Sequence, residues 1–303
     1  MTNKTINTKK AFKVCAVIYA VIIVIGIVVT LVFGPKLDIN FSGGTQISYS
    51  YKSDFKDTVA TVLKNDFTVS QNTSLAGDVQ SYVINLSGKE SISAETQESI
   101  TTALTEKFTG NDITLYNSNS VSPTIAGSFF VKSLVAVIIT AALVVLYVGI
   151  RFKKIGGVSA AITALCALVL DLLVAFFTCV IFRLQIDMNF MAVVLTILGY
   201  SLNDTIVVYD RVRENKRLYP ELSVAENMDI SISSTLVRNI VTTVTTVCAV
   251  LTIVVVSEVC GLVTLRSFAI PMTFGLISGC LSSLFVAGPL WVKYKEKTDK
   301  KSK

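Results

Sequence analysis

The sequence predicts an α-helical integral membrane protein with six transmembrane helices and a small α+β domain outside the membrane. Three observations support this fold class. Hydrophobic residues make up 52% of the chain, and charged residues make up only 16%. The apolar residues gather in six long blocks, and one long polar segment, residues 34–125, separates the first block from the second.

Each apolar block is long enough to cross the hydrocarbon core of a bilayer, which takes about 20 residues. The first block exceeds the 7–15 apolar residues of a signal-peptide core and is followed by no small-residue cleavage pattern, so we expect an uncleaved anchor. The six blocks are residues 14–33, 129–150, 158–181, 189–209, 235–257 and 267–292.

The loops predict the orientation, because Lys and Arg near the ends of spans are retained on the cytoplasmic side. Basic residues cluster before the first span, after the second, after the fourth and after the sixth, whereas the opposite loops hold only Arg183 and Arg266. We therefore expect both termini on the cytoplasmic side. Juxtamembrane charge facing anionic membrane lipid explains the net charge of +6 without a nucleic-acid partner. The expected domains are 1–33 (cytoplasmic tail and first helix), 34–126 (external domain), 127–292 (helices two to six) and 293–303 (basic tail).

The external segment shows a mixture of strand and helix patterns. Residues 45–51, 81–86 and 112–116 alternate as half-buried strands do. A first helix is expected with Asp54 as its cap and Phe55, Val59, Val62, Leu63 and Phe67 on one face. A second helix is expected from about Ser93 to Gly110, with Ile100, Leu104 and Phe108 on its apolar face. The order is β-α-β-α-β, and no catalytic constellation accompanies it, so an interaction or lever module is expected rather than an enzyme.

Histidine is absent, and all six cysteines lie in or at the ends of spans. We expect these cysteines to be buried apolar thiols, without disulfides, metal sites or cofactors. A proton relay in this chain must therefore use carboxylates, hydroxyls, tyrosines or water. The cysteines are Cys15, Cys166, Cys179, Cys248, Cys260 and Cys280.

Two charges inside apolar segments define the functional question. Asp204 lies in the fourth span, and Arg238 lies near the cytoplasmic start of the fifth. A charge in hydrocarbon costs at least about 2.5–3.5 kcal/mol, so such residues usually belong to an ion or proton pathway and have a partner nearby. The alternatives are a permanent salt bridge, or an arginine that only extends its side chain to cytoplasmic phosphates.

A third charge, Asp171, lies in a stripe of small residues in the third span, formed by Ala160, Ala164, Ala167 and Ala175. This spacing places the carboxylate against a neighbouring helix rather than lipid. It is either part of the ion pathway or an acceptor that holds helices together, and the pattern does not decide between them.

Two further spans carry helical stripes. In the fifth, Ser231, Thr235, Arg238, Thr242 and Thr245 share one face, with Thr243 and Thr246 beside it, so this face must contact protein or a wet cavity. The sixth has Gly275, Gly279, Ser283 and Ala287 at steps of four, which favours close helix packing.

These residues resemble a known family. The run from Gly199 to Asn215, which contains Asn203-Asp204-Thr205, is similar to the fourth-span signature of the SecF family, the smaller subunits of SecDF protein-export complexes and relatives of the RND transporters. Phe41-Ser42-Gly43-Gly44-Thr45 resembles the family's DFxGGT element. The stretch from Thr235 to Arg238 and the run from Ser282 to Leu290 resemble its fifth-span and sixth-span motifs.

The resemblance implies an RND/SecDF-like half with a ferredoxin-like external domain. It also implies a partner SecD, the SecYEG translocon, a translocating polypeptide, and use of the proton or sodium gradient to assist late, ATP-independent export. Asp204, Arg238 and Asp171 match the family's charged membrane positions. Tyr200, Asn203, Thr242 and Thr245 are expected as supporting polar residues, and Phe41, Gly43, Gly44 and Thr45 as the motif of the external domain.

Several positions depart from the family's pattern. Asn40 stands where the family usually has the aspartate of its DFxGGT element, and Asp38 stands where a glycine is common. Asn239 and Thr243 replace a threonine and a serine, and Leu170 replaces a histidine beside Asp171. The role of the acid in the first motif is therefore open, and Asp171 loses one possible proton partner.

Two other functions remain possible from the sequence. An RND-like, ion-coupled exporter of small molecules or lipids would have a similar core, although such exporters normally have two six-span halves and larger external domains. A purely structural assembly factor would use the same membrane charges only to join helices.

Overall fold

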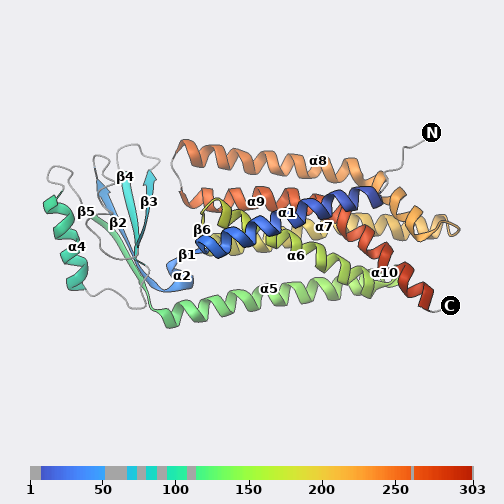
Figure 1. Ribbon diagram of the computed structural model, residues 1–303, viewed down its shortest axis with the longest axis horizontal. Helices are drawn as coiled ribbons and strands as arrows, with labels where there is room; N and C mark the ends of the chain where they lie inside the picture. The colour runs from blue at the N-terminus through green and yellow to red at the C-terminus, as the bar shows by residue number, and fades with distance from the viewer. Residues whose placement is uncertain are drawn as a thin grey trace.

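The computed structural model describes residues 8–51, 67–73, 80–86, 94–107, 114–260 and 263–301. Within these residues six helices are long and apolar enough to cross a membrane, which confirms the six expected spans. Figure 1 shows them as one elongated bundle, with a sheet domain at one end and both chain termini at the other. We call these the sheet end and the terminal end.

Every expected apolar block lies inside one of these helices. The first five spans are α1 (Thr8–Phe33), α5 (Pro123–Arg151), α6 (Gly157–Ile181), α7 (Met188–Leu218) and α8 (Val224–Val259). The sixth consists of α9 (Val263–Ser282), a π-helical turn η2 (Ser283–Ala287) and α10 (Gly288–Lys301).

Local sequence signals explain where several helices begin. Pro123 occupies the first turn of α5, where a missing N–H costs no hydrogen bond. Asp187 caps α7 by accepting a hydrogen bond from the Phe190 N–H (3.1 Å). Ser223 and Glu226 form a reciprocal capping box at the start of α8. Because α7 and α8 are joined by a short capped turn, they form an antiparallel hairpin.

Helix α6 and the sixth span form the centre of the bundle. Of the 18-residue apolar stretch in each span, 72% is buried inside the protein in the sixth span and 56% in α6. The buried share is only 17% in α8 and 11% in both α1 and α5. The outer faces of α1, α5 and α8 therefore contact lipid or a partner protein.

The six cysteines are free thiols. Cys15, Cys179 and Cys280 are buried, as expected. Cys166 and Cys248 are exposed, so the expectation of burial is wrong for these two. Both lie on apolar helices, where a thiol can face lipid at little cost because it is only weakly polar.

The sheet domain contains four antiparallel strands in the order β3-β4-β2-β5. Helix α4 (Ala94–Lys107) connects β4 to β5 and is the expected second helix. Both the strand order and the pairing are those of a ferredoxin-like sheet. The strands are β2 (Gly44–Tyr51), β3 (Phe67–Thr73), β4 (Gln80–Leu86) and β5 (Thr114–Val121).

One expectation for this domain is wrong. Phe67 does not lie on a helix face; it begins strand β3, where it pairs with Leu86 of β4. The alternation of apolar and polar residues from Phe67 to Val69 is the signal for this fourth strand. The remainder of the expected first helix, with Asp54, Phe55, Val59, Val62 and Leu63, lies outside the described residues, as do Phe108, Gly110 and residues 112–113.

Candidate ion-coupling site

Asp171 is fully buried at the centre of the bundle. Its carboxylate accepts hydrogen bonds from three serine hydroxyls, which α7 and α9 contribute. Ser201 Oγ lies 2.6 Å away, Ser278 Oγ 2.6 Å and Ser282 Oγ 2.8 Å. The carboxylate therefore holds three helices together, as the small-residue stripe predicts for a helix-joining acceptor.

Further hydroxyl groups extend this network on both sides. The Tyr19 hydroxyl from α1 donates to Ser278 O (2.9 Å) and lies 3.0 Å from Ser278 Oγ. On the other side, Thr205 Oγ1 lies 2.8 Å from Ser283 Oγ, which donates to Ser201 O (3.0 Å). The network thus connects α1, α6, α7 and the sixth span.

The sixth span changes from α-helix to π-helix beside this network. The π-helical turn starts at Ser283, and π-helical turns occur frequently at functional sites. The Tyr209 hydroxyl, which lies 2.8 Å from Thr163 Oγ1, is 3.5 Å from the carbonyl of Ala287 at the end of this turn. Tyr209 therefore gives a carbonyl of the irregular turn a partner inside the bundle.

Asp204 differs from Asp171 because its buried Oδ2 has no hydrogen-bond partner among the described residues. Its side chain is 2% exposed, and Oδ2 is unpaired. Two atoms on the buried side of α8, Asn239 Nδ2 and Thr243 Oγ1, are also unpaired. A buried polar atom without a partner costs about 1–3 kcal/mol, and native proteins keep such atoms mainly where water, an ion or a function requires them.

Contacts between α7 and α8 place these residues at similar depths. Tyr200 OH donates to Thr246 Oγ1 (3.2 Å) and Arg211 Nε donates to Ser234 Oγ (3.3 Å). Because the two helices are antiparallel, Asp204 lies level with the turn of α8 around Thr242. Arg238 is then roughly one helical turn, about 5.4 Å, nearer the terminal end.

Arg238 forms no ion pair with Asp204 in the part of the chain that the structure describes. Its charge acts on the Asp204 carboxylate at longer range. The side chain is exposed and lines a cavity at the terminal end. The permanent salt bridge considered from the sequence is therefore not the arrangement seen here.

The polar stripe of α8 is buried in part and exposed in part. Ser231, Thr235, Asn239 and Thr243 are buried in the bundle, whereas Arg238, Thr242 and Thr245 are exposed on its outside. Thr235 and Arg238 line the same cavity at the terminal end, in agreement with the expected shared face, but the stripe is buried only toward its start. Thr242 and Thr245 donate to carbonyls of their own helix, and Asn203 on α7 is exposed as well.

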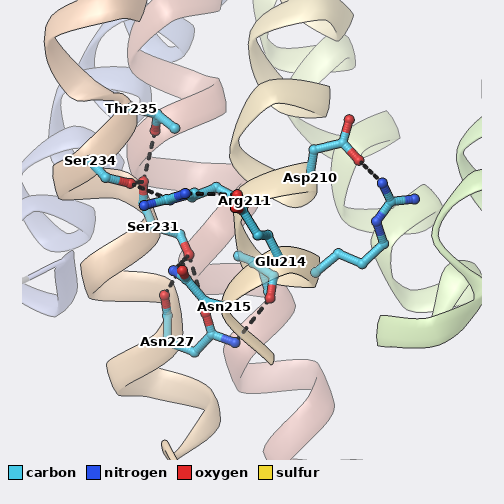
Figure 2. Close-up of polar contacts among 10 residues, drawn as sticks. Asp210, Arg211, Glu214, Asn215, Asn227, Ser231, Ser234 and Thr235 are labelled. Carbon is cyan, nitrogen blue, oxygen red and sulfur yellow. Dashed lines mark hydrogen bonds and ion pairs between the residues drawn. The ribbon is translucent and has the colours of Figure 1, made fainter. Parts of the chain in front are cut away.

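Polar contacts fix the α7–α8 hairpin at the terminal end. Asn215 Nδ2 donates to Ser231 Oγ (2.9 Å), and Asn227 Nδ2 donates to Val212 O (3.1 Å). Figure 2 shows Arg211 between these contacts and Ser234, with Glu214 and Asp210 on the same helix. A cavity of about 1040 Å³, which we call the terminal-end cavity, is lined by this hairpin and the turn before α6.

The glycine ladder of the sixth span packs against α7 within this chain. A Cβ atom added at Gly275 would lie 2.2 Å from Ile197 Cδ1, and one added at Gly279 would lie 3.0 Å from Ser201 Cβ. Ser283, the next position of the ladder, belongs to the hydroxyl network instead. Close packing by Gly279 therefore brings Ser201 within reach of Asp171.

The motif around Phe41 forms the junction between the bundle and the sheet domain. Asp38 caps the short helix α2 (Ile39–Ser42) and accepts hydrogen bonds from Asn40 Nδ2 (2.5 Å) and Gln185 Nε2 (3.2 Å). The Phe41 ring packs on Phe129 of α5, with centroids 5.4 Å apart. The carboxylate at this junction thus comes from Asp38, although the family's acid would stand at Asn40.

The glycines of this motif permit a tight connection. Gly43 has φ +74°, and a Cβ added there would lie 2.9 Å from Pro123 Cα. Gly44 also has a positive φ, of 124°, and begins β2. Thr45 is buried, and its hydroxyl lies 3.2 Å from Ser120 Oγ of β5. The chain therefore passes α5 at backbone contact before it enters the sheet.

Replacing Gly43 by alanine is expected to destabilise the junction by about 1–3 kcal/mol, because an L-residue is strained at this φ and its Cβ would press on the backbone of α5. Thermal unfolding of the purified chain in detergent measures the effect. Gly127→Ala is the matched control, since a Cβ there meets nothing within 4 Å. Equal losses in the two variants would contradict the strained connection.

Sequence reasoning did not identify Ser201, Ser278 and Ser282 as partners of Asp171, or Tyr19 as a partner of Ser278. A signal for two of them exists, since Ser278 and Ser282 are four residues apart, about one helical turn, in an apolar segment. No local pattern indicates Tyr19, because it comes from α1, far away in sequence. The terminal-end cavity also joins segments that no local pattern connects.

Comparison with known proteins identifies the family. Residues 100–297 match the family described as "Protein export membrane protein SecD/SecF, C-terminal". The chain belongs to the SecD/SecF family. The protein translocase subunit SecF of Alicyclobacillus acidocaldarius is 30% identical over 283 residues, which cover 93% of this chain and 90% of that protein.

Two longer SecD/SecF proteins are also similar. The protein translocase subunit SecDF of Bacillus subtilis is 35% identical over 293 residues, which cover 92% of this chain but 36% of that protein. The crystal structure of SecDF from Thermus thermophilus is similar in fold, with a TM-score of 0.79 and 24% identity over 98% of this chain and 40% of that chain. The family resemblance inferred from the motifs is thus confirmed, and the chain is a multi-pass membrane subunit of the protein-translocase type.

Proposed function

We propose that this chain acts as a SecF subunit, which uses the proton or sodium gradient together with SecD to assist late, ATP-independent translocation of polypeptides through SecYEG. The observation that carries this proposal is the buried, unpaired carboxylate of Asp204 in a member of a protein-export family. A carboxylate with a free oxygen inside a membrane bundle can take up a cation. The three hydrogen bonds of Asp171 leave that residue better suited to joining helices.

The outer face of α8 supports a SecD partner. Thr242 and Thr245 are exposed on this chain deeper in the span than Arg238, and the acyl chains of lipid offer these polar side chains no partners. A second bundle packed on α8 at this depth would bring polar groups to Thr242 and Thr245. A similar protein, the SecDF subunit of Bacillus subtilis, is longer than this chain, and the match covers only 36% of its length.

The charge distribution supports the orientation. Lys and Arg gather at the terminal end, in the turn before α6 and in the α7–α8 hairpin, and such residues are retained in the cytoplasm. The sheet domain at the opposite end then lies outside the bacterial cell membrane, where it would meet the emerging polypeptide (Figure 1).

In the proposed mechanism, cation uptake at Asp204 neutralises the carboxylate and releases its attraction for Arg238. The α7–α8 hairpin then moves against the core that the Asp171 network fixes. Motion reaches the sheet domain through α1 and α5, because Phe41 packs on α5 at the junction. The membrane potential contributes about 2.3 kcal/mol per charge per 100 mV, enough to bias two states of similar free energy.

Export in inverted membrane vesicles with the proton and sodium gradients imposed separately tests the proposal. Late export is expected to respond to one gradient and to stop when the matching ionophore collapses it. The same export rate with both gradients collapsed would overturn ion coupling. Extrusion of lipid by the chain purified without a second six-span protein would instead favour an exporter.

A further inference from the structure

The terminal-end cavity is lined mainly by cationic side chains. Its walls come from the turn η1 (Lys153–Ile155), from α7 and from α8. Six of its twelve lining residues are Lys or Arg, and only two are acidic. Such a concave basic surface favours an anion, because the positive potentials of its walls add up inside it.

The two acidic residues already have partners. Asp210 pairs with Arg213 (2.9 Å) and Arg151 (3.3 Å), and Glu214 pairs with Arg211 (2.7 Å). Among the described residues, the other four cations of the cavity have no carboxylate within the 4.0 Å of an ion pair. These four are Lys154, Lys216, Arg217 and Arg238.

Hydrogen bonds and packing hold the walls in place. Ile155, which is 1% exposed, anchors the turn η1 in the core. Lys216 Nζ donates to the carbonyl of Lys154 (3.2 Å), so this turn is tied to α7. The polar contacts of Asn215 with Ser231 fix α7 to α8 (Figure 2). The cations are therefore gathered by the fold before any ligand binds, which lowers the entropy cost of binding.

We propose that the terminal-end cavity binds the phosphate group of an anionic lipid headgroup, with Arg238 as its innermost ligand. Arginine and lysine together suit a phosphate, because guanidinium offers paired donors and ammonium offers a compact charge. Basic pockets between membrane helices are a known way to recognise such headgroups.

The surface beside the cavity identifies a lipid rather than a free phosphate as the ligand. Val237 and Val241, which neighbour Arg238 on α8, are 69% and 55% exposed. They continue an apolar outer face along which an acyl chain can lie while its phosphate reaches Arg238. A soluble anion would gain nothing from this face.

A ligand in the cavity also affects the attraction between Arg238 and Asp204, and this step rests on the proposed function. A phosphate bound to Arg238 competes with Asp204 for the guanidinium, so the composition of the cytoplasmic leaflet would tune ion coupling. Binding itself needs no gradient and no export, so the two proposals fail independently.

Native mass spectrometry of the full chain in detergent, titrated with phosphatidylglycerol or phosphatidylcholine, tests the site. The double variant Lys154→Gln, Lys216→Gln is expected to bind phosphatidylglycerol about thirtyfold more weakly, from the typical contribution of two juxtamembrane cations. Phosphatidylcholine binding is expected to stay unchanged. The variant Lys154→Arg, Lys216→Arg keeps both charges and is expected to retain phosphatidylglycerol binding.

The matched control removes two exposed charges from α10 at the same end, Lys293→Gln and Lys297→Gln. This control is expected to bind phosphatidylglycerol as the unmodified chain does. Equal weakening in both double variants would show diffuse surface attraction and overturn the site, as would no weakening in either. Displacement of phosphatidylglycerol by millimolar inorganic phosphate would overturn the lipid assignment in favour of a soluble anion.

Discussion

Replacing Asp204 by asparagine is expected to abolish gradient-dependent export while leaving the chain folded and assembled. The amide has the size of the carboxylate but neither binds a proton nor attracts a cation. Because the buried Oδ2 makes no hydrogen bond, the substitution removes no protein contact. We expect stability within about 1 kcal/mol of the unmodified chain, as for substitutions that break no contact. Export in vesicles and thermal unfolding in detergent measure the two quantities.

Glu221→Gln controls for the loss of one negative charge, since Glu221 is exposed in the turn between α7 and α8. It is expected to leave export unchanged. Normal gradient-dependent export by the Asp204→Asn variant would remove this residue from the mechanism. If Asp204→Asn combined with Arg238→Gln also exported normally, the chain would be a structural assembly factor.

Replacing Asp171 by leucine is expected to cause a large loss of stability, whereas Asp204→Asn is expected to leave the stability nearly unchanged. The three serine hydroxyls that donate to this carboxylate would lose their acceptor inside the bundle. Hydrogen bonds to charged groups contribute about 1.5–3 kcal/mol each, and serine hydroxyls can turn to carbonyls of their own helix, so a net loss of about 3 kcal/mol or more is expected. The midpoint of thermal unfolding in detergent measures it.

A double-mutant cycle with Ser278→Ala separates the network from a general packing defect. Ser278→Ala is expected to cost stability in the unmodified chain but little in the Asp171→Leu background, because its acceptor is already gone. Equal costs in both backgrounds would show that the hydrogen bond contributes nothing.

The contrast between the two aspartates was not readable from the sequence. Both lie in apolar spans, and the alternatives of ion pathway and helix joining applied to Asp171 without a decision. The hydrogen-bond partners of Asp171 decide between them, and they come from α7 and α9, which lie far from Asp171 in sequence. The same reason explains why the sequence did not predict which part of the α8 stripe is buried, because that depends on which helices cover each turn of α8.

The sequence also predicted only part of the sheet domain. The alternation in residues 45–51 and 81–86 predicts strands β2 and β4, because period two requires only local geometry. The fourth strand at Phe67 was missed, since an apolar residue at the end of a helical pattern also fits a helix.

The sequence alone determined the six spans, the position of the sheet domain between the first two, the family, and the presence of charge inside apolar segments at Asp204, Asp171 and Arg238. These follow from segment length, periodicity and the cost of charge in hydrocarbon, which depend on neighbours along the chain. Only the tertiary structure decided that Asp171 is satisfied, that Asp204 has a free oxygen, and that Arg238 opens onto a basic cavity. Hydrogen bonds and cavities depend on which side chains meet across helices, and a linear pattern does not contain those distances.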